Sequence, residues 1–132
     1  MIASFDFSAL RALYESGRAT PQDVVREVYR RIAAKGVKPD WISLVPEDEA
    51  LARAARLPQG PLFGLPFAVK DNIDVLGLPT TCACPAFAYN PARSATVVER
   101  LEAAGAIAIG KTNLDQFATG LVGTRSPYGI PT

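Results

Sequence analysis

The sequence contains no histidine, and this absence excludes several kinds of active site. Neither a metal site with imidazole ligands nor a Ser-His-Asp or Cys-His arrangement can be assembled from the chain. Cysteine is nearly as scarce, because Cys82 and Cys84 are the only two and one residue separates them. They are too close for an ordinary structural disulfide and too few for a closed zinc site, so we expect reduced thiols without a chemical role.

Long apolar runs and blocks of like charge are also missing. No segment approaches the roughly 20 apolar residues of a membrane span, and residues 1–10 lack the basic start and apolar run of a signal peptide. The 14 Lys and Arg residues are interspersed with 13 Asp and Glu residues, which leaves a net charge of +1. This pattern indicates no nucleic-acid partner and no membrane partner, and the cytoplasm is the expected compartment.

What is present is the composition of a folded protein. The 132 residues are 48% hydrophobic and 20% charged, close to the average for globular domains. A chain of this length fits one domain, and such a domain typically buries roughly two thirds of its unfolded surface. We therefore expect a real hydrophobic core.

The first part of the chain predicts helices. One helix is expected from about residue 6 to residue 16, ending near Gly17. The next is more clearly marked, because Thr20 can cap it, Pro21 suits its first position and Asp23 favours its positive end. Its apolar residues recur at helical spacing, which predicts one packed face.

The remaining pattern alternates strands and helices. Residues 41–45 predict a short strand, and the acidic residues after it predict the start of a helix through Leu57. Residues 63–69 predict an apolar strand, Ser94 is a candidate cap for a helix that stops at Gly105, and residues 106–109 predict a buried strand. A strand, a long crossover with a helix and a second strand form a parallel pair. The predicted class is α/β.

Lys70 is the first candidate for chemistry, because it ends the strand-like run and precedes Asp71 and Asn72. The two short polar side chains can hold a turn by bonding to nearby backbone groups. From position alone Lys70 is better explained as a strand-end lysine whose amine reaches water. A catalytic interpretation needs a neutral amine that acts as a base, which burial can supply.

Two longer segments favour the catalytic interpretation of Lys70. Residues 60–75 (GPLFGLPFAVKDNIDV) resemble the opening block of amidase-signature enzymes, which carry Gly-x-Pro-x-x-Val-Lys-Asp. Residues 94–113 (SATVVERLEAAGAIAIGKTN) resemble the helix and strand that lead to the Gly-Lys-Thr-Asn turn of the same family. The resemblance covers residue 60 to the last residue, in matching order and spacing.

The resemblance implies a domain organisation. Residues 1–59 are expected to be an N-terminal helical segment of the amidase domain. Residues 60–132 are expected to be the first part of the amidase-signature α/β core. Together they would form one truncated domain of an α/β sheet fold, incomplete as given.

The resemblance also implies a mechanism. Family enzymes use a Ser, cis-Ser, Lys triad for acyl transfer, with no metal or organic cofactor, and Lys70 matches the lysine that accepts the proton. The family's two catalytic serines lie in a glycine-rich block that follows the Ser-Pro-Tyr-Gly segment, and this chain ends at Thr132. The isolated chain is therefore expected to be inactive.

Other residues near the end of the chain have alternative explanations. Ser126 matches a structural turn of the family, so local hydrogen bonding is expected of it. A loop that by resemblance borders the substrate cavity could contact substrate or could serve turn geometry alone. The loop consists of Thr119, Gly120, Leu121, Val122 and Gly123. Lys111 follows Gly110 as in a phosphate loop, but the required upstream glycine spacing is absent, so nucleotide binding is not expected.

Within the family, residues 80–89 (TTCACPAFAY) and 113–129 (NLDQFATGLVGTRSPYG) are most similar to the allophanate hydrolases. This implies a parent enzyme that hydrolyses allophanate, a small amide, to ammonia and carbon dioxide in urea degradation. It also implies a functional link to urea carboxylase and a homo-oligomeric parent. Two alternatives stay open: another amidase or the amidase-type subunit of an amidotransferase, and a short non-catalytic domain that binds a partner or a small amide.

Overall fold

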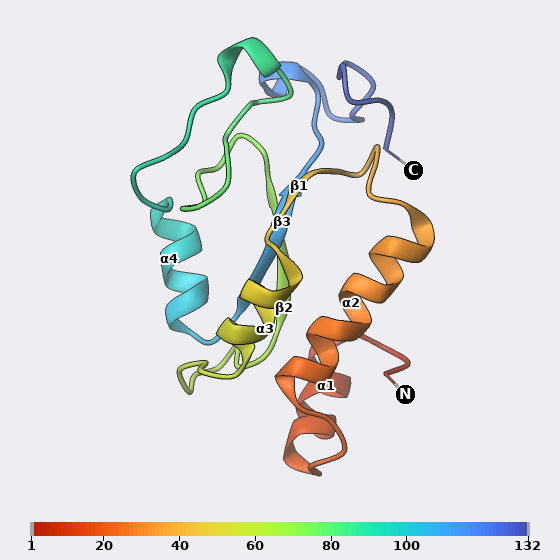
Figure 1. The fold of residues 1–132 in the computed structure, drawn as a ribbon, viewed down its shortest axis with the longest axis vertical. Helices are drawn as coiled ribbons and strands as arrows, with labels where there is room; N and C mark the ends of the chain where they lie inside the picture. Colours follow the sequence, from red (N-terminus) through yellow and green to blue (C-terminus); the bar gives the residue numbers. More distant parts are fainter. Residues whose placement is uncertain (1, 132) are drawn as a thin grey trace.

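A three-stranded sheet in the order β1-β3-β2 organises the computed structural model, which describes residues 2–131 (Figure 1). The strands are β1 (Trp41–Leu44), β2 (Pro66–Lys70) and β3 (Ile107–Thr112). β1 pairs with β3 in antiparallel orientation, whereas β2 pairs with β3 in parallel orientation. The predicted parallel pair and the predicted α/β class are confirmed.

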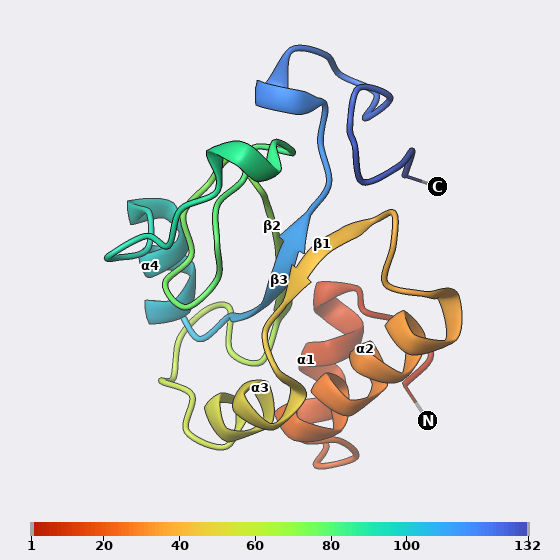
Figure 2. The same cartoon turned by 45° about the horizontal axis from the view of Figure 1, so that its top comes forward.

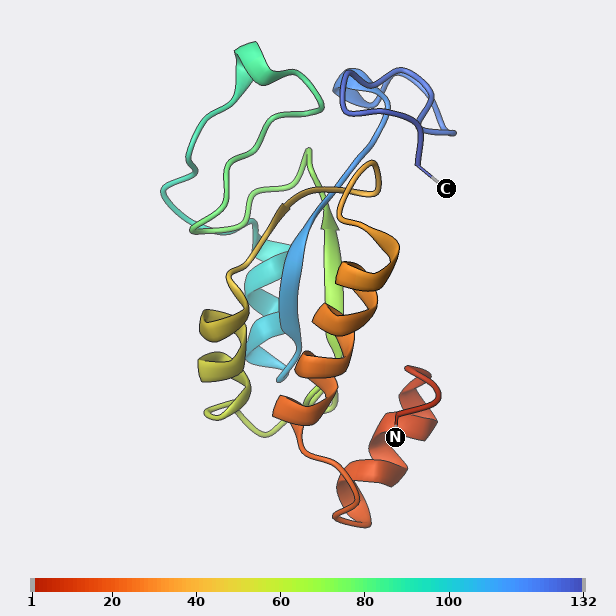
Figure 3. The ribbon, with the colours of Figure 1, turned by 45° about the vertical axis from the view of Figure 1, so that its right-hand side comes forward.

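Within residues 2–131, four α-helices lie around this sheet, and the short 3-10 helices Pro85–Phe87 and Gln116–Ala118 lie in the loops. The α-helices are α1 (Phe7–Glu15), α2 (Pro21–Lys35), α3 (Glu47–Ala54) and α4 (Thr96–Ala103). α4 lies on one side of the sheet and α2 on the other, and α1 lies at the end remote from the chain's C-terminus (Figures 1 and 3). No helix within residues 2–131 is long and apolar enough to cross a membrane.

The core forms where the helices meet the central strand. β3 is buried along residues 107–111, as expected for a strand covered on both faces. Val25 and Tyr29 of α2, Val98 of α4 and the isoleucines of β3 belong to one apolar cluster. The Tyr29 hydroxyl donates a 2.6 Å hydrogen bond to the carbonyl of Val45, so this buried polar group is satisfied.

α2 begins as the sequence predicts. The Thr20 hydroxyl accepts a hydrogen bond from the Asp23 amide at 3.3 Å, and the Asp23 carboxylate accepts one from the Thr20 amide at 2.9 Å. Pro21 occupies the first helical position. These reciprocal bonds satisfy two of the free amides at the helix start.

Replacing Thr20 with alanine is expected to lower the free energy of unfolding by about 1 kcal/mol, because it removes the side-chain half of this capping box. Urea unfolding of the 132-residue chain measures the loss. Ser8→Ala, at an exposed serine inside α1, is the matched control and should change the free energy far less. Equal losses in the two variants would contradict the role assigned to the cap.

Several boundaries differ from the sequence prediction. Ser94 does not cap α4, because its hydroxyl accepts a hydrogen bond from the distant Leu76 amide at 2.8 Å, and Ala95 occupies the cap position. α3 ends at Ala54 instead of continuing through residue 57. β3 continues past Ile109 to Thr112, so the turn expected there is strand.

Two long loops gather beyond the carboxyl ends of β2 and β3 (Figures 1 and 2). One comprises residues 71–95, between β2 and α4, and the other comprises residues 113–131, after β3. Ligands of α/β proteins characteristically bind outside the carboxyl ends of the strands. The sheet itself joins residues 1–59 to residues 60–132, because β1 pairs with β3.

Candidate functional site

Lys70 is the last residue of β2, and its side chain is exposed at the carboxyl end of the sheet. It borders a shallow hollow of about 260 Å³. The hollow is also lined by Asn113, Leu114, Asp115, Gly120, Leu121, Val122, Gly123 and Pro131. The structure therefore places Lys70 beside the predicted loop, although β2 and that loop are far apart in the sequence.

Asp115 holds in place the loop of residues 120–123, which forms one wall of this hollow. One carboxylate oxygen accepts hydrogen bonds from the amides of Val122 at 3.2 Å and Gly123 at 3.1 Å, and the other accepts one from the Arg125 amide at 2.6 Å. These backbone amides, with Arg125 making the largest contribution, hold the pKa of the Asp115 carboxyl below its ordinary value. The loop is thus folded around a single carboxylate.

Gly120 makes this arrangement possible. A Cβ atom at position 120 would overlap the Asp115 carboxylate, so a larger residue would push the carboxylate away from the amides it binds. Leu121 and Val122, by contrast, are exposed: their accessible surface is 102% and 73% of that of a fully exposed residue of the same type. The loop beside the hollow therefore exposes apolar side chains to solvent, while the amides of Val122 and Gly123 are directed to Asp115.

The lowered pKa of Asp115 makes the loop sensitive to acid. Because the folded-state pKa is depressed, the stabilisation is fully present above the unfolded value of about 4 and is lost as the pH falls through the folded-state value. We expect amide exchange at Val122, Gly123 and Arg125 to accelerate in that acid range, as NMR would measure. Asp115→Asn should remove the pH dependence, and identical profiles for the two proteins would contradict the assignment.

Asn113 fastens the last segment of the structure to the sheet. Its side-chain amide donates to the carbonyls of Pro39 at 3.0 Å and Gly129 at 2.9 Å. Its carbonyl oxygen accepts a 2.6 Å hydrogen bond from the Ser126 hydroxyl, which in turn accepts one from the Tyr128 amide. The bond with Tyr128 is the local contact that the sequence predicts for Ser126, whereas the bond to Asn113 spans 13 residues.

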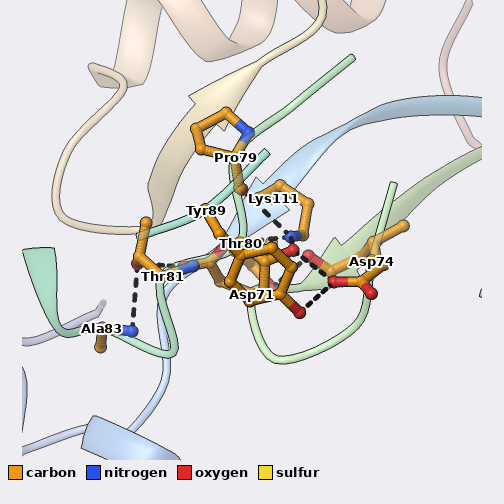
Figure 4. A network of polar contacts seen from close by, with 10 residues as sticks. Asp71, Asp74, Pro79, Thr80, Thr81, Ala83, Tyr89 and Lys111 are labelled. Atoms are coloured by element: carbon orange, nitrogen blue, oxygen red, sulfur yellow. Dashed lines mark hydrogen bonds and ion pairs between the residues drawn. The ribbon is translucent and has the colours of Figure 1, made fainter. Parts of the chain in front are cut away.

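A buried ion pair joins Asp71, the residue that follows β2, to Lys111 of β3. The Lys111 Nζ is 2.9 Å from Asp71 Oδ1, and both side chains are fully buried. Figure 4 shows this pair within a polar network. Lys111 also donates to the Pro79 carbonyl and to the Thr80 hydroxyl, each at 3.3 Å. The sequence does not identify Lys111 as a site residue, and for Asp71 it predicts bonds to nearby backbone groups.

The network continues outward to Asp74. Its carboxylate accepts hydrogen bonds from the Tyr89 hydroxyl at 2.6 Å and the Thr80 hydroxyl at 2.7 Å. These bonds, led by that from Tyr89, hold the pKa of Asp74 below its ordinary value. Thr80 therefore connects the buried lysine to a second carboxylate (Figure 4).

The two long loops meet at strained positions. Cys82 and Ala83 in one loop, and Phe117 and Ala118 in the other, have φ angles of +51° to +57°. Such angles cost energy for residues other than glycine and persist where surrounding contacts enforce them. The Phe117 amide donates to the Cys82 carbonyl at 2.9 Å, which joins the loops directly. Both cysteines are free thiols, and burial raises the pKa of the Cys82 thiol.

The predicted site residues are thus partly brought together. Lys70 and residues 120–123 line one hollow, whereas Thr119 is exposed and lies outside the lining. The Thr119 hydroxyl donates to the carbonyl of Gln116 at 2.9 Å, which closes the turn before the loop. The catalytic role of Lys70 and the substrate contacts of residues 119–123 stay predictions.

Comparison with known proteins places this geometry in a family. Urea amidolyase of Lachancea kluyveri is 51% identical over 129 residues, which are 93% of this chain and 6% of that protein. A glutamyl-tRNA(Gln) amidotransferase subunit of Geobacillus thermodenitrificans is 43% identical over 122 residues, which are 86% of this chain and 25% of that protein. The chain therefore spans a small part of the curated relatives it matches.

A solved structure agrees with these relatives. The crystal structure of selenomethionine-substituted Kluyveromyces lactis allophanate hydrolase superposes with a TM-score of 0.75 at 47% identity and covers 89% of this chain and 21% of that one. The family described as Amidase matches residues 23–132, which include the sheet, Lys70 and the loop beside it. This chain belongs to the amidase family.

Proposed function

We propose that this chain is the N-terminal part of the amidase domain of a longer cytoplasmic enzyme that hydrolyses allophanate to ammonia and carbon dioxide. The observation that carries the proposal is the placement of Lys70 beside residues 120–123 at the carboxyl end of a parallel strand pair. The similarity to urea amidolyase and to allophanate hydrolase supports the substrate.

Lys70 has the chemistry that the proposal needs. In its neutral form a lysine amine can accept a proton, and exclusion of water favours that form. We propose that Lys70 accepts the proton of a serine nucleophile through a bridging serine in a cis peptide bond, and that both serines come from the rest of the domain. The serine then attacks the amide carbonyl, ammonia leaves, and water releases the acyl group.

The loop of residues 120–123 offers apolar contacts and no free amides at Val122 and Gly123. The amides of Val122 and Gly123 are bound to Asp115, so they are not free to bind a substrate oxygen. Leu121 and Val122 are instead exposed apolar groups that can pack against a planar amide or against the rest of the domain. Donors for the developing oxyanion would then come from the serine-bearing loop.

The proposal also has consequences for partners. Urea carboxylase would be the functional partner, because carboxylation of urea produces the proposed substrate. We further propose that the full-length enzyme is a homo-oligomer. Size-exclusion chromatography with light scattering on that protein measures its oligomeric state.

The test is a substrate panel on the full-length protein that carries this segment. Allophanate should release ammonia, whereas glutamine in the presence of glutamyl-tRNA(Gln) should not. The reverse result would favour the second candidate, an amidotransferase component, which the similarity to the Geobacillus protein supports. Ammonia release from neither would overturn the proposed activity. The 132-residue chain alone should be inactive towards both substrates.

A further inference from the structure

The buried pair of Asp71 and Lys111 is connected to Lys70 through the backbone and the strand pairing. Asp71 directly follows Lys70, and Lys111 is paired with Val69, the residue before Lys70, across the parallel ladder. Asp71 Oδ1 has no hydrogen-bond partner within residues 2–131. The Lys111 ammonium is therefore the group that compensates the buried negative charge.

The other polar groups of Asp71 also form hydrogen bonds. Its amide donates to the Thr112 carbonyl at 3.1 Å, and its carbonyl accepts from the Cys82 amide at 3.2 Å. Its second carboxylate oxygen accepts hydrogen bonds from the amide and the hydroxyl of Thr81. The residue after Lys70 is thus fixed on both backbone and side chain.

This fixation determines where Lys70 points. Successive side chains of a strand point to opposite faces. Asp71 follows the last residue of β2, and its amide continues the ladder through its bond to the Thr112 carbonyl. Val69 and Asp71 are buried, whereas Ala68 and Lys70 are exposed. Holding Asp71 inward therefore holds Lys70 outward, towards the hollow.

The choice between the two orientations is electrostatic. Lys70 and Asp71 are adjacent charged residues, and a shift of one residue would place Lys70 inward and Asp71 outward. Lys111 lies fully buried on the inward face, where it attracts Asp71 and would repel a second lysine. A well-packed apolar pair of similar volume can replace a buried ion pair without loss of stability, but it would not discriminate between these orientations.

We propose that Asp71 and Lys111 are a positioning pair that fixes the register at the end of β2 and directs Lys70 into the hollow. The inference rests on the proposed role of Lys70 as the base. Neither residue of the pair touches the substrate. Their contribution is to the orientation of the amine, on which catalysis depends steeply.

The test uses the full-length protein with Asp71→Asn and Lys111→Gln combined, which removes both charges and keeps polar groups of similar size. We expect kcat for ammonia release to fall about 10- to 100-fold, while KM stays within about twofold. Tyr29→Phe is the control, because it removes a buried hydrogen bond elsewhere in the core and should leave kcat unchanged.

The outcomes separate this inference from the proposed function. Full activity of Lys70→Ala would overturn the proposed function, whereas an inactive Lys70→Ala beside a folded double variant with unchanged kcat would overturn only the positioning role. If the double variant does not fold, Thr81→Val replaces it, because it removes one hydrogen bond to Asp71. A several-fold loss of kcat at constant KM supports the pair, and an unchanged kcat overturns it.

Discussion

Replacing Lys70 with alanine in the full-length protein is expected to lower kcat for ammonia release from allophanate by about 10²- to 10⁴-fold, the usual contribution of a general base. Lys70→Arg should be equally inactive, because a guanidinium keeps its proton and cannot act as a base. The measurement is steady-state ammonia release, with the unfolding temperature of each variant recorded in parallel. Because Lys70 is exposed in this part of the protein, neither change should alter folding strongly.

A second lysine provides the control. Lys35, at the end of α2, makes a partly exposed ion pair with Asp40 and does not border the hollow. Lys35→Ala should leave kcat unchanged, since exposed ion pairs contribute little. If Lys70→Arg retained most of the activity, Lys70 would act through its charge and the proton-transfer role would be wrong.

The elements that the sequence predicts best are those specified by local contacts. The start of α2 is an example, because Thr20 and Asp23 bond to each other within one turn and the residues themselves reveal the motif. Ser94 has the same local signature, yet its hydroxyl binds the Leu76 amide. The Leu76 amide, 18 residues away in the chain, takes the place of a capping amide, and the residues next to Ser94 do not reveal this distant bond.

In the candidate site too, features set by neighbouring residues are predictable and features set by distant contacts are not. Lys70 is recognisable from the motif around it, but its meeting with residues 120–123 depends on the pairing of β2 with β3. Lys111 escaped prediction because a lysine after glycine suggests a turn, whereas here it is the largest fully buried side chain of the described residues. The available signal was that two predicted parallel strands end near opposite charges, Asp71 and Lys111, which a common sheet edge brings together.

Removing the charge of Lys111 is expected to produce the largest loss of stability in the isolated chain. Lys111→Met keeps most of the side-chain volume but leaves the fully buried Asp71 carboxylate without its counter-ion. Breaking a buried ion pair from one side costs about 3–5 kcal/mol, a large part of the roughly 5–15 kcal/mol that stabilises a domain. Urea unfolding of the 132-residue chain measures this loss, with the single tryptophan, Trp41, as the fluorescent probe.

A double-mutant cycle distinguishes the lost pair from general damage to the core. The cycle uses Lys111→Met, Asp71→Asn and their combination. Because the combination removes both buried charges, it should be more stable than Lys111→Met alone, and the two substitutions should be strongly non-additive. A loss below about 1 kcal/mol in Lys111→Met would match an exposed ion pair and would contradict the burial of this one. A large loss with simple additivity would show that the two side chains stabilise the fold separately. The attraction between Asp71 and Lys111 could then not be what keeps Asp71, instead of Lys70, on the buried face.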